Sequence, residues 1–233
     1  ALLSANAQKR AFTIEDLYRV KGVSSVSLSP DGKTVCYTAS SSDLKNQKSG
    51  SDIYIMNADG SHTKALTEDG KSSSAVWSKD GKSIFFTNYE KGTAQIFRMD
   101  LTTCEAEQVT DYELGIGSPV ISPDERYIAF TAEVYPDLGA DAKANKARME
   151  KKEQGPVQAH IADKLLYRHW TSYNDGRCNH LILFDTQTKT YKDLTPGNYS
   201  LIFVVGGGIT YQFSPDSKEI CFVSNHDEHQ EAS

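Results

Sequence analysis

Short apolar runs alternate with polar turns along this chain, and one arrangement of the two returns four times. Each repeat has a strand-like run, a turn that starts with serine and then three consecutive apolar or aromatic positions. Agreement at both a turn and a triplet indicates one supersecondary motif used several times. The turns occupy residues 29–33, 78–82, 122–126 and 214–218, and the triplets occupy residues 35–37, 84–86, 128–130 and 220–222.

The turn sequence predicts a tight connection between two antiparallel strands. In the first copy, Pro30 presets φ at the second position, Asp31 hydrogen-bonds to the backbone that follows, and Gly32 accepts a positive φ. The triplet is apolar at successive positions, which indicates a strand buried on both faces. A lone four-stranded sheet exposes one face, whereas sheets stacked radially bury both. We therefore predict an all-β fold, a β-propeller of four-stranded antiparallel blades.

The spacing of the repeats sets the blade boundaries. The turn serines stand at 29, 78, 122 and 214, so successive repeats start 49, 44 and 92 residues apart. The first two spacings are close to the roughly 45 residues of a four-stranded propeller blade. A short helix over 12–20 is expected to cap the first blade or, alternatively, to anchor to another domain, and a polar loop is expected over 40–50. The blades are expected at about 23–67, 72–110 and 117–195, with a truncated fourth at 206–233 that leaves the propeller incomplete.

Each blade is expected to hold four strands, the last ending in Leu-Thr or Val-Thr. The expected strands are 25–28, 34–39, 52–56 and one closing at 66–67; 75–77, 83–87, 95–99 and 108–110; 119–121, 127–131, 180–184 and one closing at 194–195; and 209–213 and 219–224.

Blade three carries an insertion of about 134–178 between its second and third strands. Its first half, 140–154, is rich in Ala, Lys and Glu and predicts a solvated helix or a linker. Its second half, 159–173, mixes apolar, cationic and aromatic residues, so it must pack on another part of the protein.

We expect Arg168, Trp170 and Tyr173 in this second half to face a substrate path. A planar cation beside aromatic rings suits contacts with carbonyl, carboxylate or ring groups. Alternatively, Trp170 and Leu165 pin the loop to the blade edge while Arg168 pairs with a carboxylate.

Composition excludes several classes of protein. The net charge is −6 and charged residues are 24%, so the chain offers no basic field for nucleic acid. No apolar run is long enough to span a membrane. The motif His-Asp-Glu-His at 226–229 is interpreted as a solvated loop, so neither a metal site nor a cofactor is expected.

Residues 1–7 have the pattern of a signal-peptide remnant ending in an A-x-A cleavage site, and so predict an exported protein; a disordered end is the alternative. Four cysteines do not form a disulfide framework. Cys36 and Cys221 stand at the same position of two triplets and are expected to be buried as small apolar residues.

The Ser-Pro-Asp-Gly-Lys turn, the sequence LLYRHW at 165–170 and the sequence SNHDE at 224–228 give the chain a family resemblance. From about residue 12 to 233 it resembles the N-terminal propeller of the prolyl oligopeptidase family, in particular exported dipeptidyl peptidase 5-like and acylaminoacyl-peptidase-like enzymes. The inserted segment is more specific than the turns, which TolB-like propellers share.

This resemblance implies a serine exopeptidase in which the propeller gates peptide substrates and an α/β-hydrolase domain follows it in the same polypeptide. No G-x-S-x-G motif occurs here, so no catalytic residue is assigned to this chain. The expected partners are peptide substrate and the hydrolase domain, with a homodimer as a candidate assembly. The alternative is a TolB-like periplasmic propeller that binds protein partners without catalysis.

Overall fold

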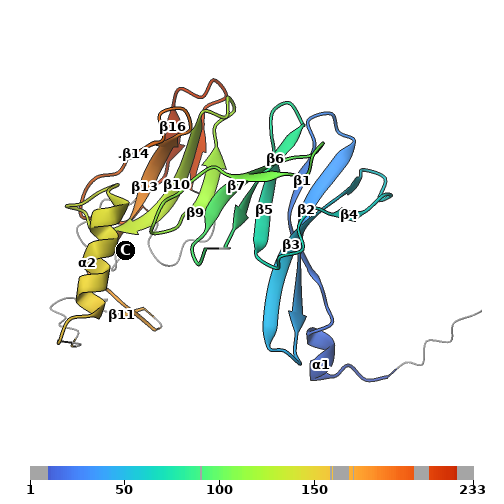
Figure 1. The fold of residues 1–233 in the computed structure, drawn as a ribbon, viewed down its shortest axis with the longest axis horizontal. Coiled ribbons are helices and arrows are strands. Elements are labelled where there is room, and N and C mark those ends of the chain that lie inside the picture. The colour runs from blue at the N-terminus through green and yellow to red at the C-terminus, as the bar shows by residue number, and fades with distance from the viewer. Residues whose placement is uncertain are drawn as a thin grey trace, which may run out of the picture. The chain divides into compact units, whose positions relative to one another are not determined.

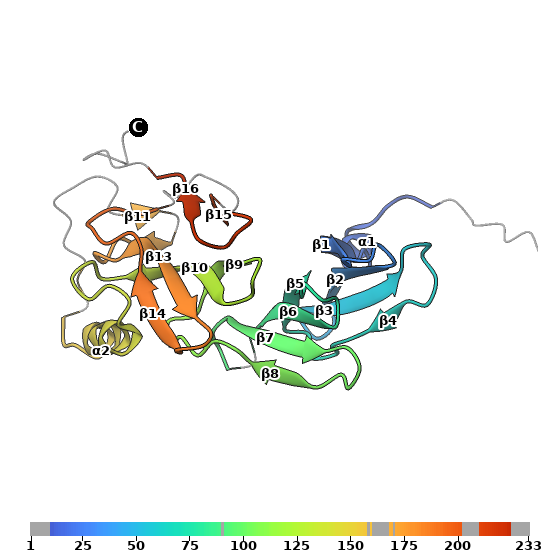
Figure 2. The ribbon, with the colours of Figure 1, turned by 90° about the horizontal axis from the view of Figure 1, so that it is seen from above.

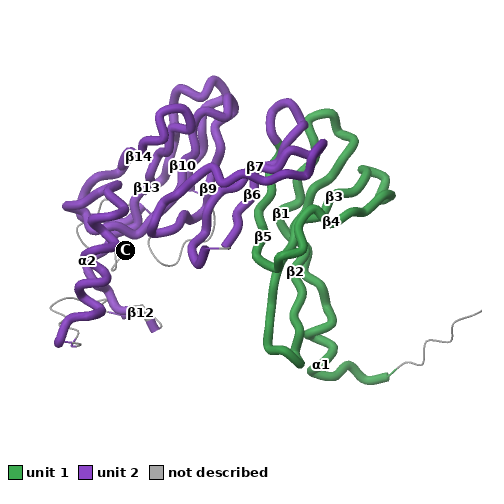
Figure 3. Tube along the Cα trace, viewed as in Figure 1, with its two compact units in different colours: residues 1–77 green, residues 78–233 purple. Residues whose placement is uncertain are grey.

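A computed structural model describes residues 10–89, 91–157, 159, 168–169, 171–201 and 210–224 of the chain. The chain divides into two compact units, residues 1–77 and residues 78–233 (Figure 3). The structure is mainly β, with the two helices α1 (Ile14–Leu17) and α2 (Ala142–Glu153) in the described part. The expected signal-peptide remnant at 1–7 and the motif at 226–229 lie outside the described residues.

Three four-stranded sheets can be followed among the described residues, and in each the spatial order repeats the chain order (Figures 1 and 2). Their strands are β1 (Gly22–Leu28), β2 (Thr34–Asp43), β3 (Lys48–Asn57) and β4 (Lys64–Ala65); β5 (Ser72–Trp77), β6 (Ser83–Asn88), β7 (Gln95–Asp100) and β8 (Ala106–Gln108); and β9 (Gly117–Ile121), β10 (Tyr127–Val134), β13 (Cys178–Asp185) and β14 (Thr190–Asp193). Two further pairs are β11 (Arg168–His169) with β12 (Ser172–Tyr173), and β15 (Tyr211–Phe213) with β16 (Ile220–Phe222). The prediction of four-stranded antiparallel blades is confirmed.

In the first unit, the prediction of a polar loop over 40–50 is wrong. β2 and β3 continue through it as one antiparallel ladder, from Ala39 opposite Asp52 to Asp43 opposite Lys48. Polar side chains do not prevent this pairing, because a hairpin ladder satisfies its own backbone groups and leaves the side chains in water. The expected helix over 12–20 is present but spans only α1, which begins with a capping box between Thr13 and Asp16.

The turns that open the repeats have the same hydrogen bonds in all four copies. The serine Oγ donates to the aspartate Oδ1 at 2.6, 2.7, 2.6 and 2.7 Å. The same Oδ1 accepts from the backbone N–H two residues later at 3.0–3.2 Å. The serine Oγ in turn accepts from the N–H five residues later at 2.9–3.0 Å. This N–H belongs to the first residue of the next strand in the first three copies and to the residue before β16 in the fourth. In the first copy the Ser29 hydroxyl is the main reason that the pKa of Asp31 is lowered.

The fourth turn position is left-handed whether or not it is glycine. The φ angle is 72° at Gly32 and 69° at Gly81, as predicted, but it is also 61° at Glu125 and 62° at Ser217. The two side chains make contacts that glycine could not make. Glu125 Oε1 accepts from the N–H of Lys79 at 2.5 Å, and Ser217 Oγ accepts from the N–H of Asp124 at 3.0 Å. Each ties its own turn to the turn of the preceding blade.

The triplets of blades two and three form the interior of the second unit, whereas Phe222 of the fourth triplet is 36% exposed. Residues 84–86 and 128–130 are all 5% exposed or less, and Phe85, Ile128 and Phe130 belong to one core cluster that joins blades two and three. In the first unit Cys36 is fully buried, as expected, and burial raises the pKa of its thiol to about 11. Cys221 contradicts the expectation because it is exposed: β15 is the only described strand that pairs with β16.

The closing threonines lie just beyond the fourth strands rather than within them. Their hydroxyl oxygens accept from the N–H of a third-strand residue, which replaces a ladder bond and ends the strand. The pairs are Thr67 with Ile53 at 3.0 Å, Thr110 with Ile96 at 2.9 Å, and Thr195 with Leu181 at 2.9 Å.

The residue before each of these N–H groups fastens the connection to the next blade. Asp52 accepts from the N–H of Gly70 at 3.0 Å, and Gln95 accepts from the N–H of Tyr112 at 3.1 Å. In blade three this position is His180, which is fully buried.

His180 contacts two acceptors. Its Nδ1 lies 2.7 Å from Asp193 Oδ2, and its Nε2 lies 2.9 Å from the carbonyl oxygen of Gly197. Only the protonated imidazole can donate from both nitrogens. Burial opposes the charge, but the hydrogen bond to Asp193 and the other contacts outweigh it and raise the pKa of His180 to about 9. His180 therefore fixes the connection after blade three as an imidazolium.

Replacing Ser122 by alanine should test the turn. Ser122 is 2% exposed, and the change removes the hydroxyl group that accepts from the N–H of Tyr127 and donates to the carboxylate of Asp124. We expect the free energy of unfolding to fall by about 1–3 kcal/mol, measured by urea denaturation. The exposed Ser41, changed to alanine, is the control and should change it by less than about 0.5 kcal/mol. Equal effects of the two substitutions would show that the turn hydrogen bonds contribute nothing.

The charged His180 should make stability depend on pH in the alkaline range. Because its pKa is raised on folding, its contribution is complete below the unfolded pKa, about 6.5, and is lost as the pH rises through about 9. We expect the melting temperature of the native protein to fall between pH 7 and pH 10 more than that of the His180→Asn variant, which should be less stable at pH 7. Parallel pH profiles of the two proteins would contradict a charged His180.

Candidate functional site

The insertion interrupts blade three without disturbing it. β10 and β13 are paired over eight successive positions, from Tyr127 opposite Asp185 to Val134 opposite Cys178. The chain leaves the blade after Val134 and returns at Cys178. These two residues, at the expected limits of the insertion, are paired with each other. The blade supplies a rigid base on which the inserted residues stand.

The first half of the insertion is a helix with a specific anchor. The Asp141 side chain caps α2 by accepting from the N–H of Ala144 at 3.0 Å. Asn145 is fully buried: its Oδ1 accepts from the N–H of Tyr135 at 2.6 Å, and its Nδ2 donates to the carbonyl oxygens of Gly139 and Asp141. A solvated helix or a linker was expected over 140–154. The structure has a helix, and the buried Asn145 that anchors it was not predicted.

Charged residues on α2 reinforce the anchor. Arg148 donates to both carboxylate oxygens of Asp137 at 2.7 and 2.8 Å, and this hydrogen bonding lowers the pKa of Asp137. The guanidinium carbon of Arg148 and the Nζ of Lys152 lie 4.6 and 5.1 Å from the centre of the Tyr135 ring. α2 is therefore fixed to the residues that follow β10.

The second end of the insertion is tied to the same place. Lys152 Nζ donates to the carbonyl oxygen of Asp175 at 2.7 Å. Arg177 Nε contacts both carboxylate oxygens of Asp175 at 2.8 and 3.1 Å. Arg177 Nη1 lies 3.2 Å from Glu133 Oε2 and 3.7 Å from Met149 Sδ. Arg177 thus joins the start of the insertion, its helix and its end.

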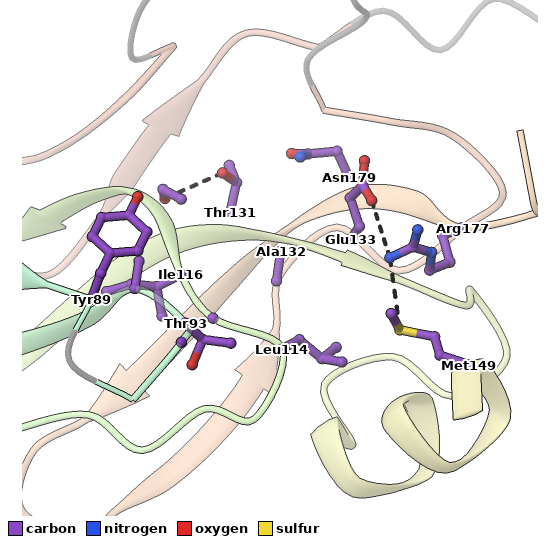
Figure 4. A pocket seen from close by; sticks show the side chains of 14 residues that line it. Tyr89, Thr93, Leu114, Ile116, Thr131, Ala132, Glu133, Met149, Arg177 and Asn179 are labelled. Atoms are coloured by element: carbon purple, nitrogen blue, oxygen red, sulfur yellow. Dashed lines mark hydrogen bonds and ion pairs between the residues drawn. The ribbon is translucent and has the colours of Figure 1, made fainter. Parts of the chain in front are cut away.

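A cavity of about 390 Å³ lies beside this network, between blades two and three (Figure 4). Its polar side chains include Glu133, Arg177 and Asn179, and its apolar lining comes from both blades and from α2. It is lined by Tyr89, Gly92, Thr93, Ala94, Leu114, Gly115, Ile116, Gly117, Thr131, Ala132, Glu133, Met149, Arg177 and Asn179.

The residues expected to face substrate are only partly placed. Arg168 and Tyr173 lie opposite each other in the β11–β12 hairpin, and both are exposed, Tyr173 by 43%. Trp170 lies outside the described residues, as do 158 and 160–167. Arg168 and Tyr173 do not line the cavity.

Sequence reasoning missed the residues that do line the base of the insertion. Glu133 and Asn179 lie in β10 and β13 just outside the predicted strands 127–131 and 180–184, and Arg177 immediately precedes β13. Met149 belongs to α2, whose sequence is typical of a solvated surface. Their positions in the sequence could have indicated them. Residues at the two ends of an insertion lie next to each other when the strands on either side of it remain paired, and Glu133 and Arg177 are charged residues at these two ends. Among the described residues no cluster of three or more His, Cys, Asp or Glu could hold a metal ion. No helix in the described part of the chain is long and apolar enough to cross a membrane.

Comparisons with known proteins agree with this architecture. A family model described as TolB beta propeller domain matches residues 11–154. Dipeptidyl-peptidase 5 of Porphyromonas gingivalis is 31% identical over 207 residues, which cover 87% of this chain and 29% of that protein. The chain therefore spans less than a third of the length of this relative.

Solved structures share the fold at lower identity. The acylaminoacyl peptidase of Pyrococcus horikoshii is 20% identical with a TM-score of 0.56, and the match covers 77% of this chain and 26% of that chain. TolB from Acinetobacter baumannii is also 20% identical, with a TM-score of 0.52 over 84% of this chain and 36% of that chain. The resemblance to the propellers of dipeptidyl peptidase 5-like and acylaminoacyl-peptidase-like proteins is confirmed. Because the family model matches more than half of this chain, the chain belongs to the TolB β-propeller domain family.

Proposed function

We propose that this chain is the substrate-gating propeller part of an exported serine exopeptidase of the dipeptidyl-peptidase type. The observation that carries the proposal is the 31% identity with a dipeptidyl-peptidase 5 over 87% of the chain. The chain itself has no G-x-S-x-G motif, so the nucleophile and the rest of the catalytic machinery would belong to an α/β-hydrolase domain C-terminal to it in the same polypeptide.

The anchored insertion supports a role in substrate selection. The exposed β11–β12 hairpin belongs to an insertion whose helix α2 is fixed by Asn145 and Arg148, so the insertion has a defined place on blade three. In this proposal Arg168, Trp170 and Tyr173 face the path of the peptide, where the guanidinium group binds carbonyl or carboxylate oxygens and the rings cover apolar groups. The gate would admit short peptides to the hydrolase domain and exclude folded proteins.

Export and assembly are further parts of the proposal. Residues 1–7 support export through their A-x-A pattern. The partners would be peptide substrate and the hydrolase domain, and a homodimer is the candidate assembly.

A second candidate function is that of a TolB-like propeller that binds protein partners without catalysis. The observation that favours it is the match to TolB from Acinetobacter baumannii over 84% of this chain. The sequence that follows Ser233 in the gene separates the two candidates, because a hydrolase sequence with G-x-S-x-G is required by the first and not by the second.

Substitutions in the hairpin test the gate. In the full-length polypeptide, Arg168→Ala and Trp170→Ala should each lower kcat/KM for dipeptidyl substrates about tenfold, because each removes a contact made with the bound peptide. The melting temperature should stay within about 1 °C of the native value, since an exposed hairpin adds little to stability.

Arg19→Ala is the matched control for the loss of an exposed arginine, and it should leave both quantities unchanged. If the two hairpin variants lose melting temperature in step with activity, the residues are structural and pin the insertion to the blade.

A further inference from the structure

The cavity at the base of the insertion has an apolar floor. Ala94, Ile116 and Ala132 are 6%, 7% and 5% exposed, and Leu114 is half-buried beside them. Met149 closes one side, with an unbranched side chain that adapts to irregular shapes. Such a surface favours an apolar group of a ligand over water.

Asn179 contributes a buried acceptor that no described group uses. Its backbone is fully engaged, because its N–H donates to Ser200 Oγ at 3.0 Å and its carbonyl oxygen accepts from the N–H of Leu201 at 2.7 Å. Its side-chain Oδ1 is buried without a hydrogen-bond partner among the described residues. A buried acceptor left in this way costs free energy, so a turn of the side chain that brought Oδ1 to a ligand N–H would recover that cost.

Arg177 contributes a donor held in one orientation. Its Nε is occupied by Asp175 and its Nη1 by Glu133 and Met149. Of its three nitrogens, Nη2 is the one for which the described part of the chain supplies no acceptor. Because the guanidinium group is planar and already fixed by its partners, Nη2 could donate to a carbonyl oxygen with little further loss of freedom.

The charges around the cavity favour a neutral ligand. The carboxylates of Glu133 and Asp175 flank Arg177, and Lys152 donates to the backbone of Asp175. Two anions are thus matched by two cations, which leaves no net charge to attract an ammonium or a carboxylate group. A peptide unit has the N–H and the carbonyl group that Asn179 and Arg177 require, and it is neutral.

We propose that this cavity is a subsite for one large apolar side chain of a peptide, such as that of Phe or Leu, together with its own peptide unit. The volume, about 390 Å³, lies at the lower end of the roughly 300–1,000 Å³ of small-molecule pockets and suits a single side chain. The proposal rests on the proposed function, because it takes peptides as the ligands.

Calorimetric binding of alanine tetrapeptides to the full-length polypeptide, inactivated with a fluorophosphonate, tests this subsite. Each peptide has a free amino terminus, and one Phe is moved through the four positions. We expect Phe at one position to tighten binding about tenfold over the all-Ala peptide, the effect of burying most of an aromatic ring. Ala132→Leu fills the floor and should remove this preference while leaving the all-Ala peptide unaffected.

Ala106→Leu is the matched control, because Ala106 is exposed on β8 outside the cavity and the change should keep the tenfold preference. If Ala132→Leu fails to fold, Met149→Ala provides the second variant: it widens the cavity and should shift the preference from Phe towards Trp. A Phe preference that survives Ala132→Leu, or no shift in Met149→Ala, would overturn the proposal.

The two proposals fail in different ways. A polypeptide that hydrolyses dipeptidyl substrates but shows no Phe preference in binding keeps the proposed function and loses the subsite. A polypeptide that binds Phe peptides with the expected sensitivity to Ala132→Leu but hydrolyses none keeps the subsite as a peptide-binding site and loses the peptidase.

Discussion

The hydrogen bond from the turn serine to the turn aspartate is the interaction on which every blade depends. It recurs at 2.6–2.7 Å in all four copies, and the same serine oxygen accepts from the N–H five residues later, at or directly before the start of the next strand. One hydroxyl group therefore sets both the shape of the turn and the register of the two strands it joins. The apolar triplet follows at a fixed distance, so in blades two and three the turn also places these residues in the core.

The repeats made most of the fold predictable. The turn and the triplet are local signals, and local signals repeated four times locate strands well even where a single copy would be ambiguous. The errors came where the chain departs from the repeat: the β2–β3 hairpin was expected to be a loop because it is polar, and Cys221 was expected to be buried because its equivalent Cys36 is. Polarity does not decide backbone pairing, and burial requires a neighbouring strand as well as a register position.

The interruption of blade three predicts a functional site in the insertion, and this stays a prediction. The cavity found beside the insertion has Glu133, Arg177 and Asn179 in its lining, which the sequence did not single out. The residues selected from composition lie on the exposed β11–β12 hairpin or outside the described residues. Two contacts that anchor α2, Asn145 with Tyr135 and Arg148 with Asp137, join residues ten and eleven positions apart, and no periodicity in the sequence predicts them. The burial of Asn145 cannot be predicted from the charged sequence of the helix, because it depends on the residues against which the helix packs.

The central claim is that peptides engage this propeller at the end that carries the insertion. Photo-crosslinking of a short peptide that carries a diazirine side chain to the full-length polypeptide, followed by mass spectrometry of the digest, tests it most directly. The account predicts crosslinks within residues 131–133 and 168–179. Crosslinks concentrated instead at the turns of the opposite strand ends, such as 78–82 and 122–126, would contradict it.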